Sequence, residues 1–104
     1  MTAPTNDLPA DEMTVVDAPG RHRFELRQHG EVLGYADYRN LGDGTVEMPH
    51  TVISPQHRGR GLGEVLVAGA VGQLDALGVG IVPTCWFVAD YLRRHPQEGR
   101  GEPR

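Results

Sequence analysis

A glycine-rich turn in the middle of the chain joins a strand-like run to a helix-like run. The turn spans residues 56–63 with the sequence QHRGRGLG, and it follows the strand-like run 46–53. At the start of a helix such a turn exposes backbone N–H groups that no helical carbonyl can satisfy. The helix dipole adds roughly half a positive charge at the same end, and Arg58 and Arg60 add full charges. Together these features predict a binding site for a phosphate-bearing ligand.

The spacing of the glycines excludes two common phosphate sites. A dinucleotide fingerprint, GxGxxG, counted from Gly59 and Gly61 would need a third glycine where the chain has Glu64. A P-loop needs Gly-Lys followed by Ser or Thr, and the chain contains no lysine. What remains is a Gln-x-x-Gly-x-Gly pattern that is extended by Gly63.

This pattern, formed by Gln56, Gly59 and Gly61, resembles the R/Q-x-x-G-x-G/A pyrophosphate cradle of the GNAT superfamily, the acetyl-CoA-dependent N-acetyltransferases. Two flanking segments strengthen the resemblance, HTVI at 50–53 and PTCWF at 83–87. They are similar to the H-T-x-V and P-x-C-[WY] strands of a small subfamily of short GNAT domains. The resemblance covers residues 14–96.

Hydrophobic periodicity predicts an α+β fold in which strands precede helices. Alternating apolar and polar residues predict an antiparallel meander, with strands at 13–17, 23–28, 32–38 and 45–53. Apolar residues at helical spacing then predict a helix from Leu62 to Leu77, with Gly78 as its C-cap. A buried strand at 79–85 and a second helix at 87–95 follow.

Pro49 interrupts the predicted strand 45–53, and a proline inside a strand indicates a bulge or an edge. The resemblance implies a GNAT-like fold in which this strand splays from the parallel strand at 79–85. It further implies that the gap between the two strands admits the pantetheine arm of acetyl-CoA.

Length and composition set the wider frame. The 104 residues predict one domain at 13–96, between disordered polar tails at 1–12 and 97–104. A net charge of −4 argues against nucleic-acid binding. No apolar stretch is long enough for a membrane span, and the N-terminus lacks the pattern of a signal peptide. Because a single cysteine fits a reducing compartment and the histidines lack metal-ligand spacing, we expect a cytoplasmic protein that uses no metal.

The resemblance implies that acetyl-CoA is bound as a co-substrate by the end of the strand and by the turn that follows it. Backbone N–H groups of the turn are expected to hold the pyrophosphate. The expected binding residues are Val52, Ile53, Gln56, Arg58, Gly59, Arg60, Gly61, Leu62 and Gly63.

Three residues are candidates for the chemistry. His50 is a natural base near neutral pH. Cys85 stands at a predicted helix start, which favours the thiolate, so it is a candidate nucleophile or acid. The resemblance implies that Tyr91 protonates the departing thiolate. Each residue also has a structural interpretation, as a hydrogen-bonded histidine, a small buried hydrophobe and a packed ring. The other histidines are expected at the surface, and Trp86 is expected to anchor the core or to wall the acyl pocket.

Typical GNAT domains place two helices after the first strand, whereas residues 13–53 show no helical pattern. We therefore expect an acceptor side that is open or completed by a partner, which favours a protein or peptide amine. The leading hypothesis is an acetyl-CoA-dependent N-acetyltransferase that acts on an amine. The alternatives are a non-catalytic acyl-CoA-binding module and a phosphate-ligand binding domain unrelated to CoA.

Overall fold

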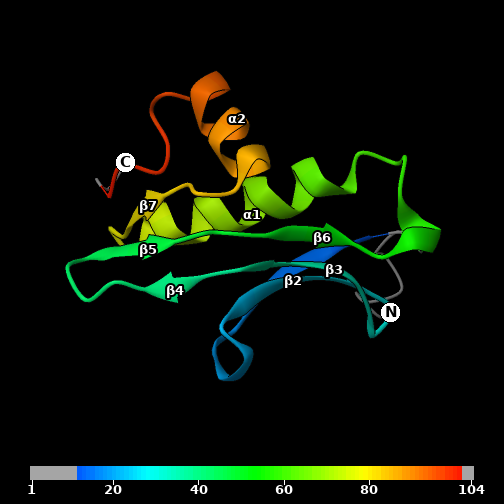
Figure 1. Ribbon diagram of the computed structural model, residues 1–104. Helices are drawn as coiled ribbons and strands as arrows, with labels where there is room; N and C mark the ends of the chain where they lie inside the picture. The colour runs from blue at the N-terminus through cyan, green and yellow to red at the C-terminus, as the bar shows by residue number, and fades with distance from the viewer. Residues whose placement is uncertain (1–11, 102–104) are drawn as a thin grey trace, which may run out of the picture.

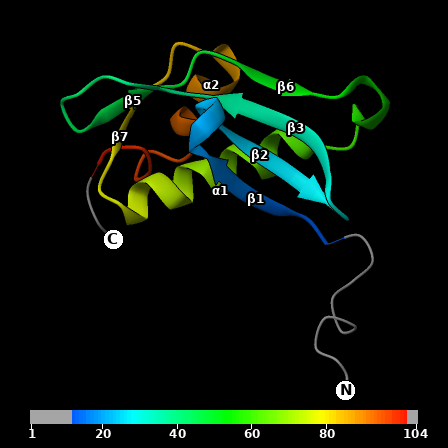
Figure 2. The ribbon, with the colours of Figure 1, turned by 90° about the horizontal axis from the view of Figure 1, so that it is seen from below.

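Two α-helices lie on one face of the sheet in the computed structural model, which describes residues 12–101 (Figure 1). Viewed from below, β1, β2 and β3 lie in front of α1, and no α-helix covers them (Figure 2). The elements in chain order are β1 (Thr14–Ala18), the 3-10 turn η2 (Pro19–Arg21), β2 (Arg23–Gln28), β3 (Glu31–Asp37), β4 (Arg39–Asn40), β5 (Thr45–Glu47), β6 (Thr51–Ile53), the 3-10 turn η3 (Pro55–His57), α1 (Leu62–Ala76), β7 (Gly80–Val82) and α2 (Trp86–Arg94).

The strands form two sheets. The chain passes from one sheet to the other between β3 and β4 and again between β5 and β6. The first has the order β1-β2-β3-β6 with every pair antiparallel, and the second has the order β4-β5-β7. In the second sheet β5 pairs with β7 in parallel. The predicted α+β fold, an antiparallel meander followed by helix, strand and helix, is confirmed.

The segment predicted as one strand at 45–53 is two strands, β5 and β6, with a break at residues 48–50. Pro49 causes the break because it has no N–H group to donate to a neighbouring strand. The last bonds across to the β7 side are Met48 N–H to the Val82 carbonyl and Cys85 N–H to the Met48 carbonyl, each 3.0 Å. Beyond them β6 pairs only with β3, so β6 and β7 part.

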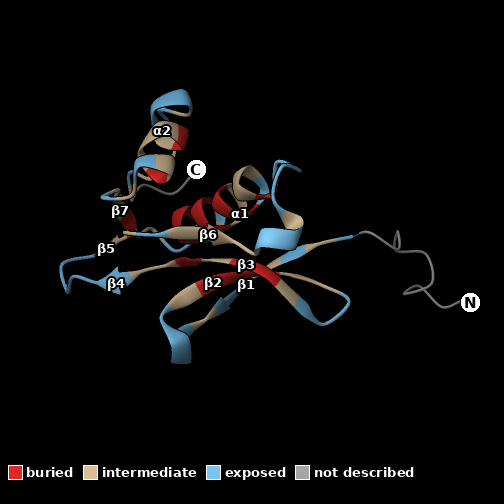
Figure 3. Ribbon diagram, turned by 45° about the vertical axis from the view of Figure 1, so that its right-hand side comes forward, coloured by how far each residue is buried: buried red, intermediate tan, exposed pale blue. Residues whose placement is uncertain are grey.

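The core lies between the sheet and α1. Figure 3 shows buried residues concentrated on α1 and in the middle of β2 and β3. Phe24 and Leu26 of β2 face α1, whose buried stripe includes Leu66 and Val67. At Gly69 the helix approaches β1 so closely that a Cβ atom would lie 2.5 Å from Val15 Cγ2. This contact fixes α1 against the sheet and thereby fixes the position of its N-terminus.

After α2 the described chain continues to residue 101 and lies against β7. The Ile81 N–H donates to the Gly99 carbonyl at 3.0 Å, and Arg100 forms a bridge with Gly80. The Gly99 N–H donates to Asp75 Oδ1 at 2.9 Å. Residues 97–101, predicted as part of a disordered tail at 97–104, pair with the edge of β7 in the structure. The N-terminal tail predicted at 1–12 lies outside the described residues except for its last one.

The uncovered face of the sheet carries a fully buried carboxylate, Glu25 of β2. Three arginines cover it, with Arg21 Nη1 and Arg23 Nε each 2.9 Å from Oε2 and Arg27 Nη2 2.7 Å from Oε1. The Arg23 guanidinium also lies over the ring of Tyr35, 4.3 Å from its centroid. Burial raises the pKa of Glu25, but the hydrogen bonds from Arg27, Arg21 and Arg23 outweigh burial and lower it to about 2.

We expect Glu25→Gln to lower the free energy of unfolding by about 3 kcal/mol at pH 7, because three guanidiniums lose their common partner. The folded-state pKa lies below the ordinary value of 4.5. This stabilisation is therefore complete above pH 4.5 and is lost as the pH falls towards 2. Urea unfolding of both proteins from pH 7 to pH 3 measures the difference.

The exposed ion pairs of Asp90 with Arg93 and Arg94 on α2 provide the control. Asp90→Asn removes the partner of Arg93 and Arg94 on α2, and it should cost less than about 1 kcal/mol. A difference between wild type and Glu25→Gln that stays constant down to pH 3 would contradict the electrostatic origin of the effect.

Candidate functional site

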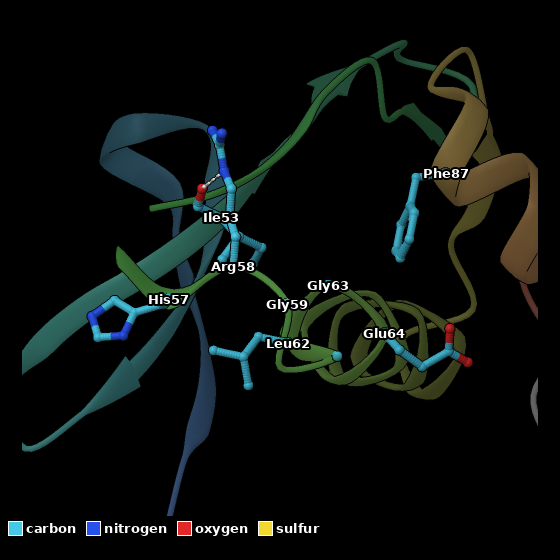
Figure 4. A pocket seen from close by; sticks show the side chains of 9 residues that line it. Ile53, His57, Arg58, Gly59, Leu62, Gly63, Glu64 and Phe87 are labelled. Carbon is cyan, nitrogen blue, oxygen red and sulfur yellow. Dashed lines mark hydrogen bonds between the residues drawn. The ribbon is translucent and has the colours of Figure 1, made fainter. Parts of the chain in front are cut away.

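A cavity of about 360 Å³ lies where β6 runs into the turn at 56–63, hereafter the cradle. Figure 4 shows Ile53 and Arg58 on one side of the cavity and Phe87 of α2 on the other. The first turn of α1 forms the wall between them. The lining residues are Ile53, His57, Arg58, Gly59, Gly61, Leu62, Gly63, Glu64 and Phe87.

The backbone of the cradle is shaped to present N–H groups. Gly59 and Gly61 have φ angles of 82° and 75°, a left-handed conformation that only glycine adopts readily. A Cβ atom at either position would meet no atom within 4 Å, so backbone conformation and not packing requires glycine. Within residues 12–101 no carbonyl accepts a hydrogen bond from the N–H of Gly59 or Gly61, and no side chain caps α1. These donors are available to an anion in the cavity.

Gly63 is needed for a different reason. A Cβ atom there would lie 3.0 Å from Cζ of Phe87, so the absence of a side chain lets the Phe87 ring close over the first turn of α1. The ring supplies an apolar wall beside the polar cradle. The narrow cavity therefore depends on Gly63 and Phe87 together.

Two arginines give the cradle uncompensated positive charge. Arg58 donates from Nε to the Ile53 carbonyl at 3.0 Å, and Arg60 Nη1 lies 3.2 Å from His57 Nδ1. Neither has a carboxylate partner among residues 12–101. The carboxylate nearest the cavity, Glu64, accepts a hydrogen bond from Arg94 Nη2 at 2.9 Å, which holds its pKa below the ordinary value. Its negative charge is thus balanced from α2.

The backbone of β6 points alternate peptide groups into the gap. The His50 carbonyl accepts from Asp37 N–H, and Ser54 N–H donates to the Leu33 carbonyl, so residues 50, 52 and 54 bond towards β3. In an antiparallel pair the intervening residues direct their N–H and C=O groups the other way. Thr51 and Ile53 therefore turn their peptide groups towards the parting of β6 and β7.

Cys85 lies at the closed end of this gap. It immediately precedes α2, and its Sγ atom lies 3.7 Å from Oγ1 of Thr51 across the parting. The predicted position of Cys85, between a strand end and a helix start, is the position that the structure gives.

His50 lies on the opposite face of the sheet from Cys85. Its side chain is 70% exposed, and Nδ1 lies 3.5 Å from Oδ2 of Asp37 on the neighbouring strand. It lines a second cavity of about 630 Å³, the open-face cavity, beside the β1–β2 connection. The members of this cavity are Arg21, His22, Asp37, Tyr38, Arg39, Asn40, Pro49 and His50. The structure therefore separates His50 from Cys85 by the thickness of β6.

Tyr91 is buried in the core and lines neither cavity. Its hydroxyl donates to Glu98 Oε1 at 2.9 Å, and its ring stacks on His95 with centroids 4.1 Å apart. Burial, with the bond to Glu98, raises the pKa of Tyr91 to about 12. Trp86, expected to anchor the core or to wall the acyl pocket, is 76% exposed at the start of α2 and lines neither cavity.

Sequence reasoning missed three residues at the site. His57, expected at the surface, is only 17% exposed and meets Glu31. Phe87 forms one wall of the cavity. The peptide group of Thr51 faces the gap, whereas Val52 was the residue expected to bind acetyl-CoA there. Strand alternation from Pro49 onwards was a signal for Thr51, since residues two apart share one side of a strand.

Residues 12–101 contain no candidate membrane span and no candidate metal cluster. Neither described helix is long and apolar enough to cross a membrane. No group of three or more His, Cys, Asp or Glu side chains in this part of the chain is arranged to hold a metal ion.

Comparison with known proteins identifies the family. The profile described as GCN5-related N-acetyl-transferase matches residues 23–100, and the chain belongs to this family. Protein NATD1 of Xenopus tropicalis is 26% identical over 89 residues, which cover 85% of this chain and 82% of that protein.

Two solved structures share the fold. A GCN5-like protein from Staphylococcus aureus, solved in solution by NMR, superposes with a TM-score of 0.59 at 19% identity and covers 86% of this chain and 85% of its own. N-acetylglutamate synthase from Neisseria gonorrhoeae, complexed with coenzyme A and N-acetyl-glutamate, superposes with a TM-score of 0.56 at 15% identity. The match covers 80% of this chain but 22% of that enzyme. The GNAT-like fold expected from the sequence is confirmed.

We expect Gly61→Val to reduce affinity for coenzyme A at least tenfold. A β-branched residue in the left-handed conformation costs roughly 1–2 kcal/mol, and relaxation of the loop would turn the N–H groups out of the cavity. Calorimetric titration with coenzyme A measures the affinity, and thermal unfolding reports the strain.

Gly42→Val is the matched control. Gly42 has a φ of 83°, a Cβ atom there would meet no atom within 4 Å, and the residue lies in the β4–β5 turn at the far end of the sheet (Figure 1). It should lose similar stability and keep its affinity. Equal affinities for the two variants would remove the cradle from the binding site.

Proposed function

We propose that the protein is an acetyl-CoA-dependent N-acetyltransferase that acts on an amine, with a protein or peptide amine as the preferred class. The observation that carries the proposal is the parting of β6 from β7, which leads directly into the glycine cradle and its unpaired N–H groups. Membership of the GCN5-related family supports it. The single cysteine and the use of acetyl-CoA favour a cytoplasmic location.

The shape of the site supports acetyl-CoA binding. The pyrophosphate is held by N–H groups of the cradle and by the charges of Arg58 and Arg60, which no carboxylate compensates. The pantetheine arm runs along the gap between β6 and β7, where Ile53 and Thr51 offer peptide groups. The thioester then reaches the closed end beside Cys85, and a Thr51 or Ile53 N–H can stabilise the oxyanion.

The acceptor amine approaches from the uncovered face. Only four residues, the turn η2 and His22, join β1 to β2, and the open-face cavity lies beside them. His50, with Asp37 at 3.5 Å, takes a proton from the ammonium group of the acceptor. The free amine attacks the thioester carbonyl, the C–S bond breaks, and the products are an acetyl amide and coenzyme A.

The departing thiolate needs a proton. Cys85 lies at the closed end of the gap and is the nearer of the two predicted donors. The Tyr91 hydroxyl is bonded to Glu98 in the core, so it serves only after leaving that carboxylate. A role for Tyr91 stays a prediction from the resemblance.

The alternative is a non-catalytic module that binds acyl-CoA. The placement of His50 and Cys85 on opposite faces of the sheet favours it, because the acceptor must meet the thioester across the strand. Thermal shift with acetyl-CoA, coenzyme A and ATP tests binding, and thiol release with a panel of peptide and small amines tests turnover. Binding of both CoA forms without turnover on any amine would favour the module, and a shift with ATP alone would exclude both.

If His50 is the base, kcat/KM should rise with pH through the range in which imidazole loses its proton. His50→Gln should remove this limb of the profile and lower the plateau by about 10²-fold. His29→Asn, at an exposed turn, is the control and should keep the parent profile. A His50→Gln profile with the same limb as the parent would exclude this role.

The absence of lysine makes the role of Cys85 directly measurable, because nonenzymatic acetylation of lysine cannot obscure an acyl-enzyme. A nucleophilic Cys85 exchanges one thioester for another, so acetyl-CoA should add one acetyl mass that hydroxylamine removes. We expect direct transfer instead, with no adduct on wild type and reduced turnover in Cys85→Ala. Intact-mass spectrometry and steady-state rates decide, and full activity of Cys85→Ala would reduce the residue to packing.

A further inference from the structure

A chain of three polar side chains, Glu31, His57 and Arg60, links β3 to the cradle. His57 Nε2 lies 3.3 Å from Oε2 of Glu31, and His57 Nδ1 lies 3.2 Å from Nη1 of Arg60. Glu31 begins β3, His57 ends η3, and Arg60 stands between the two left-handed glycines. The ring of His57 is turned away from the cavity in Figure 4.

The chemistry of the two ends fixes the state of the ring. A guanidinium can only donate and a carboxylate can only accept. His57 therefore accepts at Nδ1 from Arg60 and donates from Nε2 to Glu31, which is the neutral ring with its hydrogen on Nε2. A protonated ring would carry a hydrogen on Nδ1 and would face the Arg60 donor with a second donor of like charge.

The surroundings of His57 contain few other charges. Glu31 faces it from β3, and Arg60 faces it from the cradle. Arg58, next in the chain, is turned to the Ile53 carbonyl. The backbone of Arg60 lies between Gly59 and Gly61, which line the cavity, but Arg60 itself does not line the cavity. The guanidinium is thus held outside the cavity by a neutral partner that binds it weakly compared with a phosphate.

We propose that the coenzyme A pyrophosphate draws Arg60 away from His57, and that His57 then takes up one proton at the vacated Nδ1. This inference rests on the proposed function. The proton comes from solvent, and the resulting imidazolium is paired with Glu31 through Nε2 and adds a positive charge beside the cradle. Ligand binding is therefore coupled to proton uptake, with Glu31 and His57 as positioning residues for Arg60.

The sign of the pH dependence follows from linkage. The bound state holds more protons than the free state, so affinity is greatest at low pH and falls as the pH rises through the imidazole range. The 3′-phosphate of coenzyme A also titrates near pH 6, as phosphate monoesters do. Dephospho-coenzyme A keeps the pyrophosphate and lacks that group, so it is the appropriate probe.

Titration calorimetry at pH 7 in PIPES and in Tris buffers, which contain no phosphate, counts the protons, because these buffers differ in ionisation heat. Wild type should take up between zero and one proton per dephospho-coenzyme A bound, and His57→Gln and His57→Asn should take up none. Glu31→Gln should take up fewer protons than wild type. Arg60→Gln should bind about tenfold more weakly, as expected for one lost bond to a charged group, without proton uptake.

His29→Asn, at an exposed turn, is the control and should match wild type. Equal proton uptake by wild type and both His57 variants, with measurable binding, would overturn the coupling and leave the proposed function standing. Failure of folded wild type to bind either coenzyme at any pH from 6 to 8 would overturn both.

Discussion

The N–H group that Pro49 lacks is the constraint on which the rest of the structure depends. A strand within a sheet bonds on both edges, and at Pro49 one of those bonds cannot form. Met48 bonds towards β7 through both its N–H and its carbonyl, whereas the His50 carbonyl, two residues further on, bonds to β3. The bonding pattern therefore shifts by one residue at Pro49, and β6 leaves β7. The candidate site is consequently a break in the hydrogen bonding of a sheet, and its peptide groups were made available by the fold itself.

Much of the fold could be predicted because its signals are local. The bounds predicted for the second strand, 23–28, are those of β2, since Phe24 and Leu26 alternate with charged residues over a full strand. Pro49 was a visible signal of irregularity, but the strand-like residues on both sides of it concealed that β5 and β6 have different partners. The order of 97–101 was not predictable from composition, because it comes from backbone bonds to β7 and to Asp75.

The candidate site, like the fold, has parts that could be predicted from sequence and parts that could not. Gly59 and Gly61 could be predicted from sequence because a left-handed backbone at a helix start strongly favours glycine. Sequence alone could not show that His50 and Cys85 lie on opposite faces of the sheet. That placement depends on which side chains point to each face, and it required the register of β6 with β3. The partner of His57 is 26 residues away along the chain, so nothing near His57 indicated it.

The uncovered face of the sheet has a consequence for how small such a domain can be. An exposed sheet usually needs a second layer because its middle is apolar. Here the middle of β2 is Glu25, and the arginines above it keep their charged ends in water while their stems cover the strands. A chain that shields its sheet with side chains in place of helices keeps that side reachable by something as large as another protein.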